Sequence, residues 1–522
     1  MRRYTTNTQN VLAFGLPFEG SLDPKNRWVL LADALPWDDL VKPYLDTLCE
    51  NNGRPSVDAR RVVAALLIKH LKGLSDDNTI EEVKENPYLQ YFAGLPAFQQ
   101  HKLFEPSLFV TLRKRLGDTK FDEMNDVIIR HFTVKTTPKD DIPKDDIPKD
   151  DIPKDDIPKD DIPKDDIPKD TKIATIMHKG HLKIDTTAAP QNITFPTDFK
   201  LLNKCRQHTE HLIDCLYFEL KLTLKPRTYR KEARAAYLKI ARIKSKSKKQ
   251  IRKGLKEQLA YIRRNIKTIN TLWDTLAAKN EKNGTFATPE SWKLIDLRNW
   301  WVLQEVYSQQ RFMYDNNVTR IDHRIVSISQ PYVRPIVRGK EHKKTEFGAK
   351  IGLSTCNGYS RLDHIDWTNY GDAADLPLQV ERYKKLYGYY PESVNADKIY
   401  HTKANHAYLK DKEIRFIGKP LGRPTTVSKT AAAQRTLRKE QAQRNLIEGK
   451  IGQMKTTYGL DLILAKTSRT TFAWIAASVL VTNLVTALKA LRLWLKTEIA
   501  YLLKLLALIT YNPKWKPQNS TF

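Results

Sequence analysis

The feature that most constrains the fold is a tandem repeat in the first third of the chain. From Pro138 to Ile167 the pentad PKDDI occurs six times, and a partial copy continues to Asp170. Proline at every fifth position removes a helical donor and clashes with the preceding turn, so a continuous helix is excluded. Each pentad has one apolar residue, and 7 Lys against 13 Asp give the tract a net charge of −6. We therefore expect residues 136–172 to form a disordered linker between two folded parts. An acidic mimic of DNA is the alternative role for the tract.

Positive charge is concentrated beyond this tract. The 522 residues carry 88 Lys and Arg against 60 Asp and Glu, a net charge of +28. Within residues 221–267 there are 18 Lys and Arg but only two acids, so this stretch alone contributes +16. A solvated helix face normally mixes signs, whereas a surface that contacts phosphates does not. We predict a polyanionic partner, with nucleic acid favoured over an anionic membrane surface, and contacts from Lys248, Lys249 and Arg252.

Cysteine usage and hydropathy exclude several other classes. The four cysteines form no CxxC pair and no zinc-ligand spacing with histidine, so neither a Cys/His zinc site nor a disulfide scaffold is expected. The first ten residues lack an apolar segment typical of a signal peptide. The apolar stretch 472–488 is shorter than the ~20 residues of a spanning helix and contains Thr482 and Asn483. We expect buried helices of a cytoplasmic protein, with membrane contact as the alternative, and C-terminal apolar and basic helices with a tail over 486–522. No GxxxxGK[ST] motif occurs, so no nucleotide cofactor is expected.

The part before the repeat, residues 1–135, has the pattern of several short helices. Apolar residues recur at helical spacing in SVDARRVVAALLIKHLKGLS, and Ser75 is placed to cap the following helix. The segment PSLFVTLRKRLG carries Arg113, Lys114 and Arg115 together. A basic helix among short helices favours a DNA-binding domain of the helix-turn-helix type. An ordinary helical bundle is the alternative.

The part after the repeat alternates between strand and helix patterns, which indicates an α/β core. HLKIDTTA at 181–188 predicts a strand that ends in an acidic residue, and residues 199–320 then predict basic helices. Helices are also expected over 380–388, over KANHAYLKD and from Lys429 to about Tyr458. Further strand patterns lie at 324–330, 347–355, 360–367, 393–400 and 413–420.

Three carboxylates stand out by their position in these elements. Asp185 and Asp397 come at predicted strand ends, and Glu448 lies on a predicted helix. If the fold brings them together, three hard oxygen donors would suit Mg²⁺ or Mn²⁺. Two such ions can activate a nucleophile and stabilise the leaving oxygen of a phosphodiester. Each acid alone is a weak signal, because other acids compete with them: Asp363, Asp366, Asp372, Glu440 and Asp461.

The blocks around these carboxylates resemble those of bacterial insertion-sequence transposases of the DDE type. KIDTTAAPQNITFPTD is similar to the first-aspartate motif, YPESVNADKIYHTKANHAYLKDKEIRFIGKPLGRP to the second-aspartate block, and RNLIEGKIGQMKTTYGL to the glutamate block. IVSISQPYVRPIVRGKEHKKTEFGAKI resembles the segment that leads into the sheet in one subgroup. Residues 1–130 resemble the helical N-terminal domain of that subgroup.

The resemblance implies an RNase H-like mixed sheet flanked by helices, with a large basic helical insertion after the first strand and an all-α N-terminal domain. The catalytic domain would span 173–485, with the insertion at about 199–320. Asp185, Asp397 and Glu448 match the catalytic and metal-binding triad, which implies two Mg²⁺ or Mn²⁺ ions. Arg444 and Lys455 match an Arg four residues before the glutamate and a Lys seven after it, roughly on one helix face.

Two details qualify this carry-over. Lys450 on the same helix is a further expected DNA contact, whereas Gln441 stands where the family signature has a Tyr. The implied activity is hydrolysis of a phosphodiester at the element ends, followed by transfer of the 3′-OH into target DNA. The implied partners are terminal inverted repeats, target DNA and further copies of the chain in a dimer or larger synaptic assembly at the nucleoid. The alternatives are a decayed or domesticated DNA-binding protein and a related metal-dependent nuclease.

Overall fold

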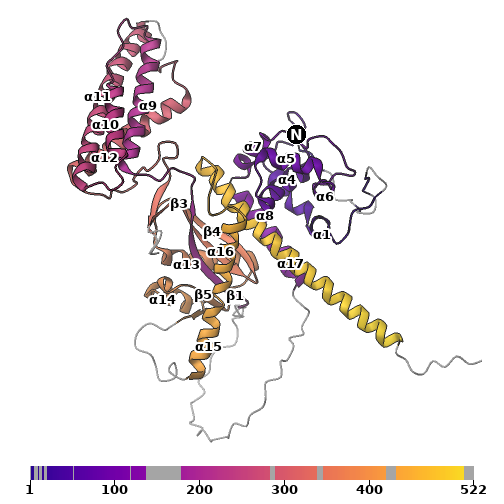
Figure 1. Cartoon of the computed structure of the whole chain (residues 1–522). Helices are drawn as coiled ribbons and strands as arrows, with labels where there is room; N and C mark the ends of the chain where they lie inside the picture. Colours follow the sequence, from indigo (N-terminus) through magenta and orange to yellow (C-terminus); the bar gives the residue numbers. More distant parts are fainter. Residues whose placement is uncertain are drawn as a thin grey trace, which may run out of the picture.

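The computed structural model describes residues 20–50, 52–117, 119–136, 178–282, 288–337, 345–418 and 431–510, together with 2–4, 10 and 14–16. The PKDDI tract lies outside the described residues, so its predicted disorder stays a prediction. In the described part the fold is mixed α/β: a curled sheet lies between an N-terminal group of helices and a separate helical bundle (Figure 1).

The N-terminal region is helical in the residues described, apart from a single β-bridge between Gly15 and Ala97. Two of its helices begin at capping side chains: the Asp58 carboxylate accepts from Arg60 N, and the Ser75 hydroxyl accepts from Asn78 N. The predicted cap at Ser75 is thus confirmed. The helices are α1 (Arg27–Ala34), α2 (Trp37–Leu40), α3 (Lys42–Leu45), α4 (Ala59–Lys72), α5 (Asp76–Glu85), α6 (Pro87–Phe92), α7 (Leu108–Leu116) and α8 (Thr119–Thr136).

The sheet has six strands in the order β2-β3-β1-β5-β6, and β4 pairs with β3 beside β2. β1 is antiparallel to β3 and parallel to β5, which is parallel to β6. The central position of β1 explains its apolar residues, because a central strand is covered on both faces. The strands are β1 (His181–Pro190), β2 (Arg334–Val337), β3 (Thr345–Cys356), β4 (Tyr359–Asp366), β5 (Ser393–Asn395) and β6 (Arg415–Ile417).

Alternating residues of β1 face two different apolar clusters. Leu182 and Ile184 pack with the helices between β4 and β6, whereas Ala189 packs with the C-terminal helices. The first group is α13 (Leu376–Tyr387) and α14 (Lys403–Asp411), with the 3-10 turns η2 (Asp372–Asp375) and η3 (Lys398–Tyr400). The second group is α16 (Asn445–Thr457) and α17 (Ser468–Thr510), preceded by α15 (Ala431–Ala442).

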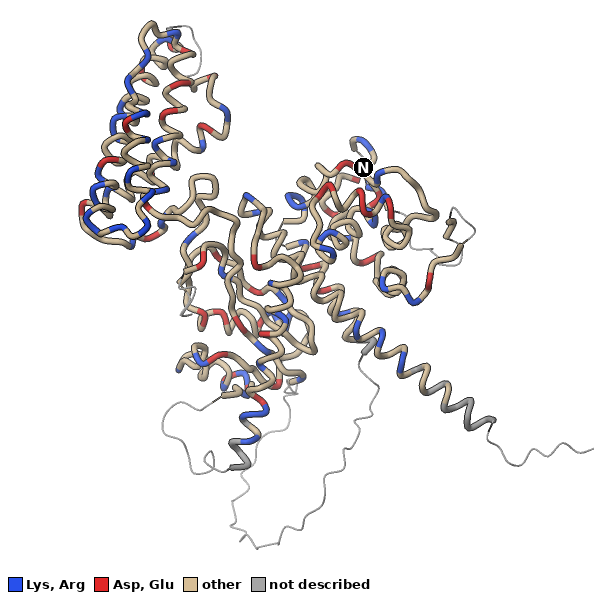
Figure 2. The backbone as a smooth tube through the Cα atoms, in the orientation of Figure 1, with Lys and Arg blue, Asp and Glu red and all other residues tan. Residues whose placement is uncertain are grey.

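A helical bundle is inserted between β1 and β2 and projects from the sheet (Figure 1). It has its own apolar core, in which Trp292 and Trp300 pack with Leu303 and Ile262. Lys and Arg residues lie along its outer helices (Figure 2). Its helices are α9 (Asp198–Glu219), α10 (Arg230–Ala241), α11 (Lys248–Lys282) and α12 (Leu294–Asp315).

Several element predictions need correction. Residues 324–330 are not a strand: Arg298 of α12 donates to the carbonyls of Ile328 and Ser329, so this segment bonds to the bundle instead of a strand. The strand at 393–400 ends at Asn395, because Asp397 caps the turn η3 by accepting from Lys398 N. The single helix expected from Lys429 is two helices, α15 and α16, separated at residues 443–444.

The helix α17 joins the N-terminal region to the sheet. It packs against α7, α8 and β4. It also continues without a break across residue 485, the predicted end of the catalytic domain. By length and composition its segment Ser468–Thr497 could span a membrane, but 78% of its apolar window is buried inside the protein. The buried side chain of Asn483 bonds to Asn125 of α8 and to Ser360 of β4. These contacts are those of a core helix.

Candidate active site

Asp185 lies in the middle of β1 and not at its end, because the strand continues to Pro190. Its position opposite Leu353 of β3 turns it away from Leu182 and Ile184, toward the side covered by α16. The parallel register between β1 and β5 ends at Lys183 and Asn395. Asp397 follows two residues after the end of β5, at the N-cap of η3, and its charge acts on Asp185. The two aspartates predicted to converge are therefore neighbours.

Glu448 comes from the first turn of α16, which packs against β1. Arg444, at the N-cap position of α16, connects Glu448 to Asp185 of β1. One guanidinium nitrogen lies 2.5 Å from Glu448 Oε1 and the other lies 3.7 Å from Asp185 Oδ2. Arg444 is 25% exposed, Asp185 18% and Glu448 47%, so this ion-pair network opens to solvent on the glutamate side.

The environment of Asp185 disfavours its charged form. Burial raises the pKa of its carboxyl, and the nearby Glu448 and Asp397 carboxylates raise it further. The hydrogen bond from Thr186 N and the Arg444 guanidinium oppose this shift. Both the Glu448 and Asp397 carboxylates therefore lie within electrostatic reach of Asp185. A cation between them would lower the repulsion among the three.

The chemistry of these donors fits a hard divalent cation, because all three offer carboxylate oxygens. Their arrangement in the structure is not yet that of a ligand set. In the ranges described, no group of three or more His, Cys, Asp or Glu side chains is placed to hold a metal ion. Arg444 instead pairs with two of the three carboxylates.

The other DNA contacts predicted on α16, Lys450 and Lys455, differ in how they are surrounded. Lys450 is half-buried, its ammonium bonds to the Thr486 hydroxyl, and burial lowers its pKa to about 8. Lys455 lies on α16 beyond Glu448 and is partly exposed. A cation as enclosed as Lys450 is placed to support the packing of α16 on α17, and its predicted contact with DNA stays a prediction.

The predicted DNA contacts outside α16 also differ in accessibility. Arg113 is 11% exposed and forms a bidentate pair with Asp76, which occupies its guanidinium. Its neighbours Lys114 and Arg115 are exposed on α7. On the bundle, Lys248 and Lys249 are exposed at the start of α11, whereas Arg252 donates to Asn317 and lies over the Tyr314 ring.

Sequence reasoning missed two residues that hold the site together. Asn395, buried at the end of β5, donates to the carbonyl of Glu440 on α15. Arg415 of β6 pairs with the Glu440 carboxylate. Together they connect the helix before Arg444 to the strands beside Asp185. The sequence signal for Asn395 is the short strand pattern SVN, because a polar residue in a buried strand needs a hydrogen-bond partner.

The described residues form a mixed α/β fold with a basic surface, in which Asp185, Asp397 and Glu448 lie within electrostatic reach of one region around Asp185. Two family models match parts of this chain. A model described as "Transposase DDE domain" matches residues 394–485, and one described as "Transposase domain (DUF772)" matches residues 16–115. The first match includes Asp397 and Glu448, whereas Asp185 lies outside it. Both descriptions are of transposase domains, and together the two matches indicate an insertion-sequence DDE transposase, each over less than half of the chain.

Comparisons with curated proteins and with solved structures were also made of this chain. "Uncharacterized protein ORF8 in nfe locus" from Rhizobium meliloti is 31% identical over 103 residues, which are 20% of this chain and 49% of that protein. The chain thus spans about half the length of the curated relative that it matches. The search of solved structures found no significant match.

Proposed function

We propose that this transposase cleaves DNA at the ends of its element and transfers the 3′-OH strand into target DNA, using Asp185, Asp397 and Glu448. The observation that carries the proposal is their convergence from β1, the end of β5 and α16. The strand order supports an RNase H-like core, because β4, β3 and β1 are antiparallel and β5 and β6 are parallel to β1.

In this proposal the three carboxylates hold Mg²⁺ or Mn²⁺, two ions in all. The bound cation would supply Lewis-acid activation of the attacking and leaving oxygens. The chain's own contribution is positioning and charge. With a cation bound by the carboxylates, the Arg444 guanidinium, which pairs with Asp185 and Glu448 in this structure, would be available to a DNA phosphate. Cations of the basic bundle and of α7 contact the DNA backbone, so binding weakens with salt.

The partners follow from the same chemistry. We propose that the chain binds double-stranded DNA at the terminal inverted repeats and at the target, in a dimer or larger synaptic assembly at the bacterial nucleoid. One observation favours a second candidate, a decayed or domesticated DNA-binding protein: the described side chains form no metal-ligand group of three. A related nuclease that cuts without joining would use the same triad.

Manganese binding tests the site apart from activity. We expect the full chain without DNA to bind Mn²⁺, measured by electron paramagnetic resonance, and Asp185→Asn and Glu448→Gln to lose that binding, while DNA binding is measured separately without divalent ions. Asp461→Asn is the control, because it removes an exposed acid that is not one of the triad. A wild-type chain that binds DNA but no Mn²⁺ would favour the decayed binder instead.

A further inference from the structure

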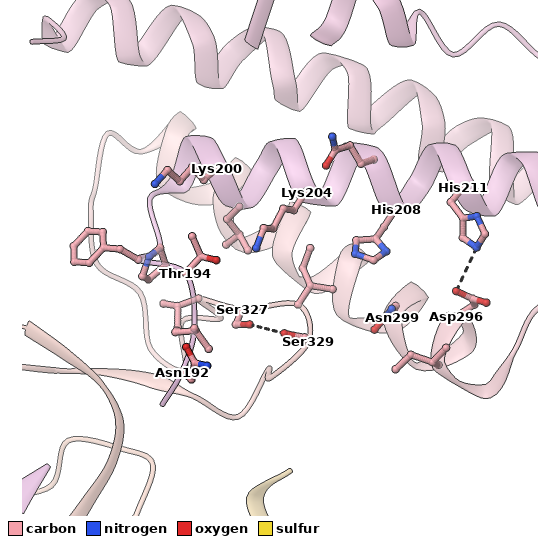
Figure 3. Close-up of a pocket in the computed structure, with 18 residues that line it drawn as sticks. Asn192, Thr194, Lys200, Lys204, His208, His211, Asp296, Asn299, Ser327 and Ser329 are labelled. Carbon is pink, nitrogen blue, oxygen red and sulfur yellow. Dashed lines mark hydrogen bonds and ion pairs between the residues drawn. The ribbon is translucent and has the colours of Figure 1, made fainter. Parts of the chain in front are cut away.

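The inserted bundle has a cleft where it joins the sheet. The cleft has a volume of about 750 Å³ and lies between the segment after β1, one face of α9, the start of α12 and residues 326–329 (Figure 3). The transposase matches at 16–115 and 394–485 do not include it. From Asp185 to Asn192, at the cleft wall, seven residues of extended chain span about 23 Å. The cleft is therefore separate from the carboxylate site.

One wall of the cleft is a row of nitrogen-bearing side chains. Lys200, Lys204, His208 and His211 recur at helical spacing on α9 and point into the cleft from it (Figure 3). At 1.5 Å per residue the row is about 16 Å long. Lys200 and Lys204 are exposed, and neither pairs with an acid in the described part of the chain. Two adjacent unpaired ammonium groups favour an anion.

The opposite wall supplies neutral polar groups. The hydroxyls of Ser327 and Ser329 lie 3.1 Å apart, and Asn299 adds an amide (Figure 3). Asp296 is the one carboxylate among the lining residues, and it lies 3.7 Å from His211 Nε2 and accepts from Lys293 N. Burial lowers the pKa of His208, and the nearby His211 and Lys204 add to this effect. The Lys200 end of the cleft therefore combines positive potential with hydrogen-bond donors.

We propose that this cleft binds consecutive phosphates of one strand of duplex DNA, with Lys200 and Lys204 as ion-pair partners and the two serine hydroxyls as donors. Lys200 and Lys204 are four residues apart on α9, about 6 Å along its axis, so their ammonium groups can contact neighbouring phosphates of one strand. The inference rests on the proposed function, since it takes DNA as the ligand. It assigns the backbone contact to α9, beyond the basic surface at the start of α11.

Binding of a 40-base-pair duplex of arbitrary sequence to the full chain, without divalent ions, tests this assignment. We expect Lys200→Ala/Lys204→Ala to raise the Kd about tenfold at 0.1 M salt and to lower the salt slope by about 2. Ser329→Glu, which adds a negative charge in the cleft and keeps both lysines, should weaken binding similarly. The matched control is Lys239→Ala/Lys279→Ala, which removes two exposed cations from α10 and α11.

Acylation of lysines, read by mass spectrometry, gives a second readout. Duplex DNA should protect Lys200 and Lys204, and inorganic phosphate alone should not. Equal losses of affinity in the cleft and control variants would overturn the proposal, because general attraction would then explain binding. Protection by phosphate as strong as by DNA would also overturn it, in favour of a small-anion site. Wild-type protein that binds no DNA would instead remove the proposed function itself.

Discussion

A buried asparagine connects the N-terminal helices to the sheet, beside the ion pair of Arg361 with Asp126 and a shared apolar core. In Asn483 of α17, the amide nitrogen donates to Asn125 Oδ1 at 2.8 Å and to the Ser360 carbonyl at 2.6 Å, and Oδ1 accepts from Ser360 N at 2.7 Å. The three residues are 0%, 4% and 1% exposed. Water therefore cannot replace a lost partner, and we predict a large effect for Asn483→Leu.

The size of the effect follows from the groups that lose their partners. Leucine leaves Ser360 N without an acceptor and Asn125 Oδ1 without a donor, whereas the Ser360 carbonyl keeps its bond from Asn125 Nδ2. Each unpaired buried group costs about 1–3 kcal/mol, and added apolar contact offsets about 1 kcal/mol. The expected loss in the free energy of unfolding is about 3 kcal/mol.

Urea unfolding, followed by circular dichroism and tryptophan fluorescence, measures this loss. With an m-value of about 3 kcal/mol/M the midpoint should fall by about 1 M. The control is Thr482→Val, because the equally buried Thr482 hydroxyl bonds only to the Ser478 carbonyl one turn earlier in α17. It should cost less than about 1 kcal/mol. If both variants unfold at the same urea concentration, the asparagine does not hold the two parts together.

Two further predictions concern α16. Arg444→Gln leaves Asp185 and Glu448 without their shared cation, so it should lower the melting temperature measured in chelator. Added Mg²⁺ should then raise the melting temperature of the variant by more than that of the wild type. An equal Mg²⁺ response in the two proteins would refute the ion-pair role. Lys450 has a pKa of about 8 in the folded chain, below its unfolded value, so the folded state binds fewer protons between these values. Stability should therefore rise from about pH 8 to 10 through this group, and Lys450→Met should remove that rise in pH-dependent urea titrations.

Local signals in the sequence predicted local structure well. The cap at Ser75, the helical apolar spacing of α4 and the strand pattern at 347–355 depend on near neighbours, and all three are confirmed. The segment 324–330 has the same kind of pattern as a strand, yet Arg298 from another helix takes its carbonyls. Patterns do not show which distant group will supply a hydrogen bond, so this prediction was wrong.

The candidate site shows the same division. The residue types and their elements pointed to Asp185, Asp397 and Glu448, and strand register together with α16 brings them near one another. The pairing of Arg444 with Asp185 joins residues far apart in the chain, and sequence spacing carries no information about it. The roles of these residues in binding metal and DNA stay predictions.

The central claim is that the three carboxylates cut DNA at the element ends. The most direct test is cleavage of a plasmid that carries the DNA flanking the gene, with purified full-length protein and Mg²⁺ or Mn²⁺. The account predicts metal-dependent breaks at the ends, which Asp397→Ala and Glu448→Gln abolish while both variants still bind the plasmid. Wild-type protein that binds those ends but never cuts them with either metal would contradict it.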